Sequence, residues 1–298
     1  MSSRLALILV DGLGIGGNDP AVNPMAKDGL QRLNVFFEGK HLRQPKDGCC
    51  IPTDACLGVE GLPQSATGQT ALLTGVNASE ASGQHWPGFP NRVCREILKK
   101  QSLLKQVSEK RRSAVFINAY RSIFFDLPLA KQYRLSATTV ANLTAGLPFM
   151  KIEDISQGNA LYHDYENRYL IEKGFDVPSL NADAAANIFT GISRKFDLTF
   201  YETFMTDRCG HRQDMQAAYG EIKKLDALID ALLANLDLRE TTLLIASDHG
   251  NIEDLSVKTH TRNPAMTLVW GDCAFFADRI RSLTDITPAI LEYLSIAK

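Results

Sequence analysis

The sequence predicts an α/β protein whose mostly parallel central sheet is covered by helices on both faces. Short apolar segments rich in β-branched residues recur along the chain, and segments with helical periodicity separate them. A chain of 298 residues, of which 45% are hydrophobic and 22% charged, is also long enough to bury a full core. These observations favour strands and helices that alternate within one globular unit.

Five apolar segments are predicted as core strands. They cover residues 5–10, 114–118, 198–205, 241–246 and 266–270. The clearest helix is predicted over residues 215–236, where apolar side chains recur three and four positions apart. Crossover helices between strands are typical of a parallel sheet.

Residues 122–194 interrupt this alternation with mixed helix and turn signals, such as Gly146-Leu147-Pro148. We therefore predict a discontinuous catalytic core of residues 1–121 and 195–298, with an inserted cap of residues 122–194. An insertion that leaves the sheet near the carboxyl ends of its strands lies over the ligand crevice. An irregular part of a single domain is the alternative that the pattern leaves open.

Charge and cysteine content limit the partners and the compartment. The net charge is -2 and the pI about 6.3, so we expect neither nucleic acid nor a membrane as a partner. The apolar run at 5–10 is too short for a signal peptide, and six cysteines without a CxxC pair favour reduced thiols, hence a cytoplasmic protein. Cys49, Cys50 and Cys56 lack a matching cluster of metal-binding residues nearby, so ordinary burial is expected for them.

Side chains that commonly bind metal ions lie next to several predicted strands. Each one alone is also typical of a turn or a helix cap. The carboxyl ends of parallel strands share one edge of a sheet, however, so these side chains are expected to converge there. Carboxylate and imidazole ligands together suit zinc or manganese rather than calcium. The candidate ligands are Asp11, Asp207, His211, Asp248, His249 and His260.

The segment 62–75 contains a candidate nucleophile, Ser65, at a turn before a predicted helix. A hydroxyl at this position can be activated by a bound metal and can face a substrate with helix N–H groups behind it. The alternative is that Ser65 only caps the helix over 66–74. Thr67 is the rival nucleophile.

The glycines of residues 12–17 contain the dinucleotide-binding spacing G-x-G-x-x-G after a strand. That fingerprint requires a helix directly after the glycines, whereas Asp19-Pro20 and Asn23-Pro24 delay one. We therefore do not expect a dinucleotide fold.

With these residues in place, the chain resembles the alkaline-phosphatase superfamily and, within it, the branch of cofactor-independent phosphoglycerate mutase and phosphopentomutase. The resemblance covers about half of the chain and follows the same order. It rests on Val10-Asp11-Gly12, Ser65-x-x-Gly68, Asp207-x-x-x-His211, Ser247-Asp248-His249-Gly250-Asn251 and His260-Thr261-x-x-Pro264. It implies an alkaline-phosphatase-like fold and two divalent metal ions, Mn or Zn.

The resemblance also implies roles for individual residues. One metal ion would be held by Asp207, His211 and His260, and the second by Asp11, Asp248, His249 and the Ser65 oxygen. Ser65 lies ten residues before Gly75, as the nucleophile does in related phosphodiesterases. Two features differ from the mutases of this branch, which show Gly-His where this chain has Gly68-Gln69 and which carry a much longer insertion.

These observations predict a two-metal phosphoryl-transfer enzyme acting on a small phosphorylated substrate. The leading hypothesis is hydrolysis of a phosphate ester through a phosphoserine at Ser65. The alternatives are an intramolecular phosphomutase for a sugar phosphate or phosphoglycerate, and a non-catalytic metal-binding protein that keeps the fold. Arg92 and Arg121 are predicted as substrate contacts because a guanidinium binds anionic groups in a bidentate manner.

Overall fold

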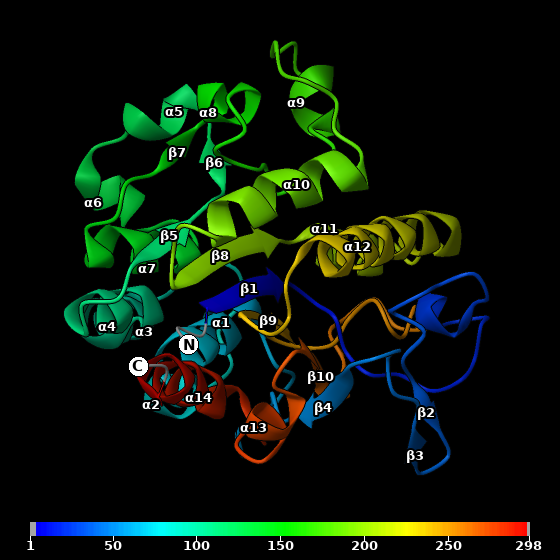
Figure 1. The fold of residues 1–298 in the computed structure, drawn as a ribbon. Helices are drawn as coiled ribbons and strands as arrows, with labels where there is room; N and C mark the ends of the chain where they lie inside the picture. Colours follow the sequence, from blue (N-terminus) through cyan, green and yellow to red (C-terminus); the bar gives the residue numbers. More distant parts are fainter. Residues whose placement is uncertain (1–3, 297–298) are drawn as a thin grey trace.

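The computed structural model describes residues 4–296, and a six-stranded sheet forms its centre (Figure 1). All five predicted strands are present. The sixth, β4, was not predicted because its sequence contains a proline, which is typical of a sheet edge rather than of a core strand. The strands are β1 (Arg4–Val10), β4 (Cys49–Thr53), β5 (Ala114–Phe116), β8 (Leu198–Thr203), β9 (Thr241–Ser247) and β10 (Ala265–Trp270).

The strand order is β4-β10-β9-β1-β8-β5, and the sheet is mostly parallel, as predicted. Strands β5, β8, β1 and β9 run parallel to one another. Strand β10 runs antiparallel to both β9 and β4. Because β10 is reversed, the residues before it lie at the same sheet edge as the residues that follow β1, β8 and β9.

Strand β1 is buried on both faces, which explains its continuous apolar sequence. Successive side chains of a strand point to opposite faces of the sheet. Leu5, Leu7 and Leu9 accordingly belong to one buried apolar cluster, whereas Ala6 and Ile8 belong to the cluster on the other face.

Helices cover both faces of the sheet (Figure 1). The predicted helix 215–236 is observed as α12, and its side chains Ile222, Leu225 and Ile229 are buried against the sheet in the same cluster as Ile8. On the other face, Leu72 and Leu73 pack with the leucines of β1. One face carries α10 (Ala182–Ser193) and α12 (Met215–Asn235), and the other α1 (Ser65–Thr74), α3 (Arg92–Gln101), α4 (Leu103–Glu109), α7 (Ala137–Ala145) and α14 (Leu283–Ile296).

Shorter elements connect these layers. The predicted strand over 198–205 is two residues too long. Strand β8 ends at Thr203, and helix α11 already begins at Met205. The remaining short elements are η1 (Pro24–Ala26), β2 (Phe37–Glu38), β3 (His41–Leu42), α2 (Ala78–Ser82), α11 (Met205–Gly210) and α13 (Cys273–Ala277).

Most of the predicted cap lies beside the β5 and β8 edge of the sheet, at the top of Figure 1. It has a small apolar cluster of its own, which includes Ile155, Tyr162 and Leu170. Helix α7 packs on α3 and α4, however, and α10 packs on α12, so both contact the core layers. The cap also contains β7 (Met150–Lys151), α5 (Ser122–Phe125), α6 (Leu129–Gln132), α8 (Ile152–Ser156) and α9 (Arg168–Glu172). Strand β7 pairs with β6 (Ala119–Tyr120), which precedes the predicted boundary. The division at residues 121 and 195 stays a prediction.

Two further sequence expectations concern membranes and cysteines. Among residues 4–296, no helix combines the length and the apolar character needed to cross a membrane. All six cysteines are free thiols, and Cys50 is buried while Cys49 and Cys56 are half-buried. Within the described part of the chain, none of these three belongs to a group of side chains that could hold a metal ion.

Candidate metal centre

The carboxyl-terminal edge of the parallel strands gathers all six predicted ligand residues. They come from four segments that are far apart in the sequence, and the reversed direction of β10 brings the fourth segment to this edge. These segments carry Asp11 after β1, Asp207 and His211 in and after α11, Asp248 and His249 after β9, and His260 before β10.

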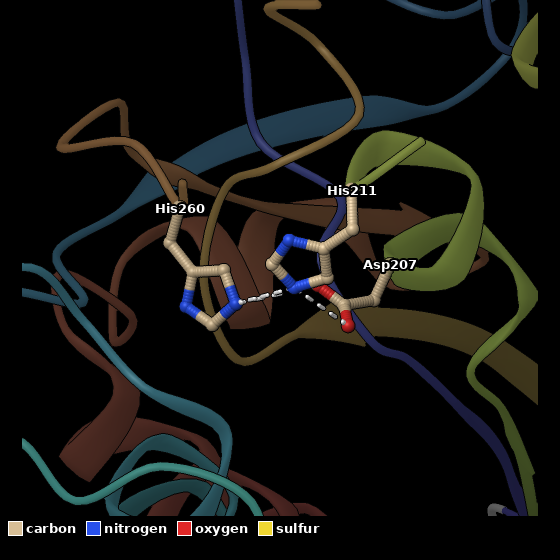
Figure 2. Close-up of side chains that lie close together, drawn as sticks. All are labelled: Asp207, His211 and His260. Atoms are coloured by element: carbon tan, nitrogen blue, oxygen red, sulfur yellow. Dashed lines mark hydrogen bonds and ion pairs between the residues drawn. The ribbon is translucent and has the colours of Figure 1, made fainter. Parts of the chain in front are cut away.

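The first group consists of Asp207, His211 and His260 (Figure 2). One turn of α11 separates Asp207 from His211, so the two side chains lie on the same face of the helix. Asp207 Oδ2 lies 3.4 Å from His211 Nε2, and Asp207 Oδ1 lies 3.4 Å from His260 Nε2. The two imidazole Nε2 atoms are 3.3 Å apart. Three potential donor atoms therefore face one another at a spacing that a single cation can occupy.

The second group consists of Asp11, Asp248 and His249, and all three side chains are buried. His249 Nε2 lies 3.2 Å from Asp11 Oδ1 and 3.6 Å from Asp248 Oδ2. The two groups are neighbours, because the rings of His249 and His260 stack with centroids 3.8 Å apart. The structure thus brings together the same two sets of residues that the resemblance implied.

Backbone carbonyls fix the orientation of the imidazoles in the first group. His260 Nδ1 lies 2.8 Å from the carbonyl oxygen of Pro63, and His211 Nδ1 lies 2.9 Å from that of Lys258. Because a carbonyl oxygen only accepts a hydrogen bond, Nδ1 is the protonated nitrogen in each ring. The lone pair of Nε2 then points into the group, which is the arrangement that histidine ligands of metal ions adopt.

Ser65 is the first residue of α1, and its hydroxyl lies beside the second group. Ser65 Oγ is 3.0 Å from His249 Nε2. The N-cap residue of α1 is Gln64, without a side-chain cap bond, so the alternative that Ser65 only caps this helix is wrong. The rival Thr67 is fully buried, and its hydroxyl donates to the Gln64 carbonyl and accepts from the Trp86 N–H. The geometry therefore favours Ser65 as the nucleophile.

The second group has the electrostatic signature of a cation site. Asp11 Oδ1 and Asp248 Oδ2 are buried, and the imidazole of His249, at 3.2 Å and 3.6 Å, is the group that faces both of them. Two buried carboxylates that share one imidazole cost free energy unless a further cation compensates their charge. Burial, together with the nearby Asp248 carboxylate, raises the pKa of Asp11 to about 7. A divalent ion would neutralise both carboxylates and use the free lone pairs. The mixed carboxylate and imidazole donors fit zinc or manganese.

We expect chelation to destabilise the protein more at pH 8 than at pH 5. The folded-state pKa of Asp11, about 7, exceeds its ordinary value of 3.8, so without metal its contribution favours folding below pH 4 and is lost as the pH rises through 7. Metal binding itself strengthens as the ligands lose protons. The difference in melting temperature between metal-loaded and EDTA-treated protein should therefore widen with pH. A difference that is constant between pH 5 and pH 8 would contradict this electrostatic account.

The glycine run at residues 12–17 serves close packing, and no helix opens directly after it. The next helical element begins at Pro24, which agrees with the expectation that this is not a dinucleotide fold. A Cβ atom on Gly12 would lie 2.9 Å from the Asp207 Cβ, and one on Gly14 would lie 2.4 Å from the Glu253 carboxyl carbon. Small residues are required here because the loop after β1 passes directly against the loops that carry the candidate metal ligands.

Glu253, a buried residue that the sequence analysis did not single out, joins the loops that carry the ligands. Its carboxylate accepts hydrogen bonds from the N–H of Gly14 (2.9 Å) and of Asn251 (2.7 Å). It also accepts from the Asn263 side-chain amide and the Thr261 hydroxyl. The loops after β1, after β9 and before β10 are thereby held in one arrangement, which supports the geometry of the ligands.

Replacing Gly14 with alanine is expected to lower the free energy of unfolding by about 1–3 kcal/mol, because the new methyl group overlaps the fixed Glu253 carboxylate. Urea denaturation of metal-loaded protein measures this loss. Gly17→Ala is the matched control in the same loop, since a Cβ there meets nothing within 4 Å and the backbone φ is not positive. Equal stability of the two variants would show that the Glu253 position is not restrained as the structure indicates.

The two arginines predicted as substrate contacts lie in different places. Arg121 lines the cavity that contains Ser65, Asp11 and Asp207. Arg92 lines a separate hollow formed by α3 and α6, together with Arg95 and other residues, so the structure does not bring it to the candidate metal ligands. Arg121 remains a candidate substrate contact.

Several polar neighbours of the candidate ligands were missed as site residues. Gln69 donates from its amide to Asp11 Oδ2 at 3.2 Å. Asn251 donates to Asp207 Oδ1 at 2.6 Å. Glu202 lines the same cavity, and burial raises its pKa to about 7. One signal for Glu202 was available, since it is an acidic residue within an otherwise uncharged strand.

Solved structures of similar fold span the whole chain. The PH0037 protein of Pyrococcus horikoshii matches with a TM-score of 0.63 and 14% identity, and the match covers 100% of this chain and 98% of that one. The alkaline phosphatase of the Antarctic bacterium TAB5 matches with a TM-score of 0.57 and 14% identity, covering 99% of each chain. The sheet topology and these likenesses show that the protein has an alkaline-phosphatase-like α/β fold.

Sequence comparison identifies the family. A family model described as "Metalloenzyme superfamily" matches residues 148–298, which is just over half of the 298-residue chain. The chain belongs to this metalloenzyme superfamily. It resembles the 2,3-bisphosphoglycerate-independent phosphoglycerate mutase of Desulforudis audaxviator, with 28% identity over 128 residues, or 41% of this chain and 25% of that protein. The 2,3-bisphosphoglycerate-independent phosphoglycerate mutase 2 of Methanosarcina barkeri is 32% identical over 113 residues, or 36% of this chain and 22% of that protein. The matched segments therefore span about a quarter of these relatives.

Proposed function

We propose that this protein is a two-metal phosphoryl-transfer enzyme that hydrolyses a phosphate monoester through a phosphoserine at Ser65. The observation that carries this proposal is the position of the Ser65 hydroxyl. Its oxygen lies 3.0 Å from His249 Nε2, which also faces the buried carboxylates of Asp11 and Asp248, and it belongs to the first turn of α1. A hydroxyl in this setting can become a nucleophile.

In this proposal the chain holds two divalent ions, manganese or zinc. The first ion is bound by Asp207, His211 and His260, and the second by the group of Asp11, Asp248 and His249 with the Ser65 oxygen. Bound ions would lower the pKa of the Ser65 hydroxyl and offset the negative charge of the phosphoryl group.

The residues of the chain then position the reacting atoms. Ser65 Oγ forms a bond to phosphorus while the bond from phosphorus to the ester oxygen breaks, and the alcohol leaves with a proton. The N–H groups of the first turn of α1 and the dipole of this helix favour the negative phosphoryl oxygens. Water next attacks phosphorus, releases inorganic phosphate and restores the serine hydroxyl.

Intramolecular phosphomutase activity is the second candidate, and the similarity to phosphoglycerate mutases favours it. In a mutase, a second hydroxyl of the retained substrate replaces water as the acceptor, so solvent must be excluded from the phosphoserine. Phe89 and Ile123 at the cavity are 62% and 61% exposed, which supports solvent entry and hence hydrolysis.

Two assays on the purified protein, loaded with manganese or zinc, test the proposal. The first measures inorganic phosphate released from an aryl phosphate, and the second follows positional isomerisation of a phosphoglycerate and a phosphosugar by phosphorus NMR. Metal-dependent phosphate release is the expected result. Isomerisation without release would replace hydrolysis by mutase activity. Tight metal binding without turnover on a panel of phosphate and sulfate esters would instead identify a non-catalytic metal-binding protein.

A further inference from the structure

The cavity above Ser65 is large and predominantly apolar. Its volume is about 660 Å³, which is within the range of pockets that hold small organic ligands. Ser65, Asp11 and Asp207 lie at its polar end. Ile123, Leu127 and Leu135 add aliphatic surface to the rest. Six aromatic residues complete the walls, namely Phe89, Tyr120, Phe124, Tyr162, Tyr169 and Phe204.

Packing from behind holds one aromatic wall in place. The ring centroids of Tyr120 and Phe124 are 4.4 Å apart, and Phe149 supports them at 4.9 Å and 4.7 Å. The Tyr120 hydroxyl bonds to Thr139 Oγ1 at 2.7 Å. Because this hydroxyl already has a partner, Tyr120 offers the cavity its ring rather than a polar group.

A second wall is a stack of rings centred on His163. This imidazole lies 4.1 Å from the Phe204 ring and 4.1 Å from the Tyr162 ring, centroid to centroid. Burial, with Arg208 and Arg121 nearby, lowers the pKa of His163 to about 3, so the ring is uncharged at neutral pH. The wall therefore also presents uncharged ring surface to the cavity.

The charged side chains that line this space are two arginines and three carboxylates. Within residues 4–296, Arg121 and Arg208 are the two arginines of the lining, no lysine joins them, and the acidic groups Asp11, Glu202 and Asp207 also line it. Away from these two arginines, the carboxylate of a phosphoglycerate, or the hydroxyls of a phosphosugar, would leave water for an apolar wall at a cost in free energy. An apolar organic group would instead gain from burial.

We propose that this cavity binds the organic group of an aromatic or arylalkyl phosphate monoester, with the phosphate at Ser65 and the ring between the aromatic walls. This inference rests on the proposed function and specifies its substrate class. The preferred substrates of the cavity are then phosphate esters of phenols and arylalkyl alcohols rather than phosphoglycerate and phosphosugars.

A pair of substrates with leaving alcohols of similar acidity tests the inference. The value of kcat/KM for 2-phenylethyl phosphate should exceed that for ethyl phosphate by about 30-fold, because only the first buries a phenyl group. Binding without turnover is measured by calorimetry on metal-loaded protein, and phenylphosphonate should bind more tightly than methylphosphonate. Equal constants within each pair, or a higher kcat/KM for 3-phosphoglycerate, would overturn the inference.

Two exposed residues of the wall allow a mutational test that does not threaten the core. Ile123→Ser and Phe89→Ser should each reduce the ratio of the two kcat/KM values, by about threefold to tenfold. Leu129→Ser is the matched control, since Leu129 is similarly exposed, at 59%, but lines the hollow that contains Arg92. A ratio that falls equally in all three variants would show that the cavity wall does not select the organic group.

The same measurements separate failure of this inference from failure of the proposed function. Phosphate release from both esters without a preference would support hydrolysis but contradict the aromatic substrate class. Phosphonate binding with the expected preference, but no release from any ester, retains the apolar site and removes hydrolysis.

Discussion

Ser65→Ala is expected to lower kcat/KM for phosphate release by about 10³-fold or more, because the variant lacks the hydroxyl that would form the phosphoserine. The fold should survive, since the side chain of Ser65 is half-buried and its hydroxyl makes one hydrogen bond, to His249. Brief mixing of the wild-type enzyme with substrate, followed by acid quench and peptide mass spectrometry, should place a phosphoryl group on Ser65. Melting temperature checks that the variant is folded.

Thr67→Val is the control for this experiment. Thr67 lies two residues further along α1, and its hydroxyl is occupied by the Gln64 carbonyl and the Trp86 N–H. We expect the variant to keep turnover within about tenfold of wild type, with some loss of stability from the broken hydrogen bonds. If Thr67→Val removed turnover and Ser65→Ala did not, the nucleophile would be Thr67.

The convergence of the candidate ligands was predictable because it follows from sheet topology. Asp11 and Asp248 each follow a parallel strand, and parallel neighbours end at one edge whatever their order in the sheet. The place of His260 required one more fact, the antiparallel direction of β10, which apolar periodicity does not encode. The motif His260-Thr261-x-x-Pro264 nevertheless allowed His260 to be expected at the correct edge by resemblance.

Contacts between loops were not predictable in the same way. Glu253 follows the ligand loop after β9 at no characteristic spacing, and its partners Gly14 and Thr261 lie far apart in the sequence. The aromatic walls could not be predicted for the same reason. Phe89, Phe124 and Phe204 come from three separate segments and meet only in the folded chain. Hydrophobic patterns identify such residues as apolar but do not distinguish a cavity wall from a core.

Asp11→Asn is expected to have opposite effects on activity and on the stability of the metal-free protein. The amide has the shape of the carboxylate but is a poor metal ligand. Metal affinity should therefore fall by more than the roughly 10- to 100-fold that results from loss of a residue hydrogen-bonded to a ligand. Turnover should fall with it, by about 10³-fold. Metal content after dialysis and phosphate release measure the two losses.

In EDTA-treated protein at pH 8, the same substitution should raise the melting temperature. Burial opposes protonation of His249, but Asp248 and Asp11 raise its pKa to about 10, so its single positive charge faces two buried carboxylates. Removing one carboxylate leaves a neutral pair, and the shift in the pKa of Asp11 from 3.8 to about 7 corresponds to a gain on the order of a few kcal/mol. The gain should vanish below pH 4, where Asp11 is protonated in both the folded and the unfolded chain.

Asp19→Asn is the matched control for both effects. Asp19 follows β1 in the same loop as Asp11, is exposed, and accepts a hydrogen bond from the Ala21 N–H that an asparagine oxygen can also accept. This variant should leave metal content, turnover and the metal-free melting temperature unchanged. If Asp11→Asn instead lowered the melting temperature of the metal-free protein at pH 8, the carboxylates of Asp11 and Asp248 would not be in electrostatic conflict. Their arrangement would then give no reason to place a cation between them.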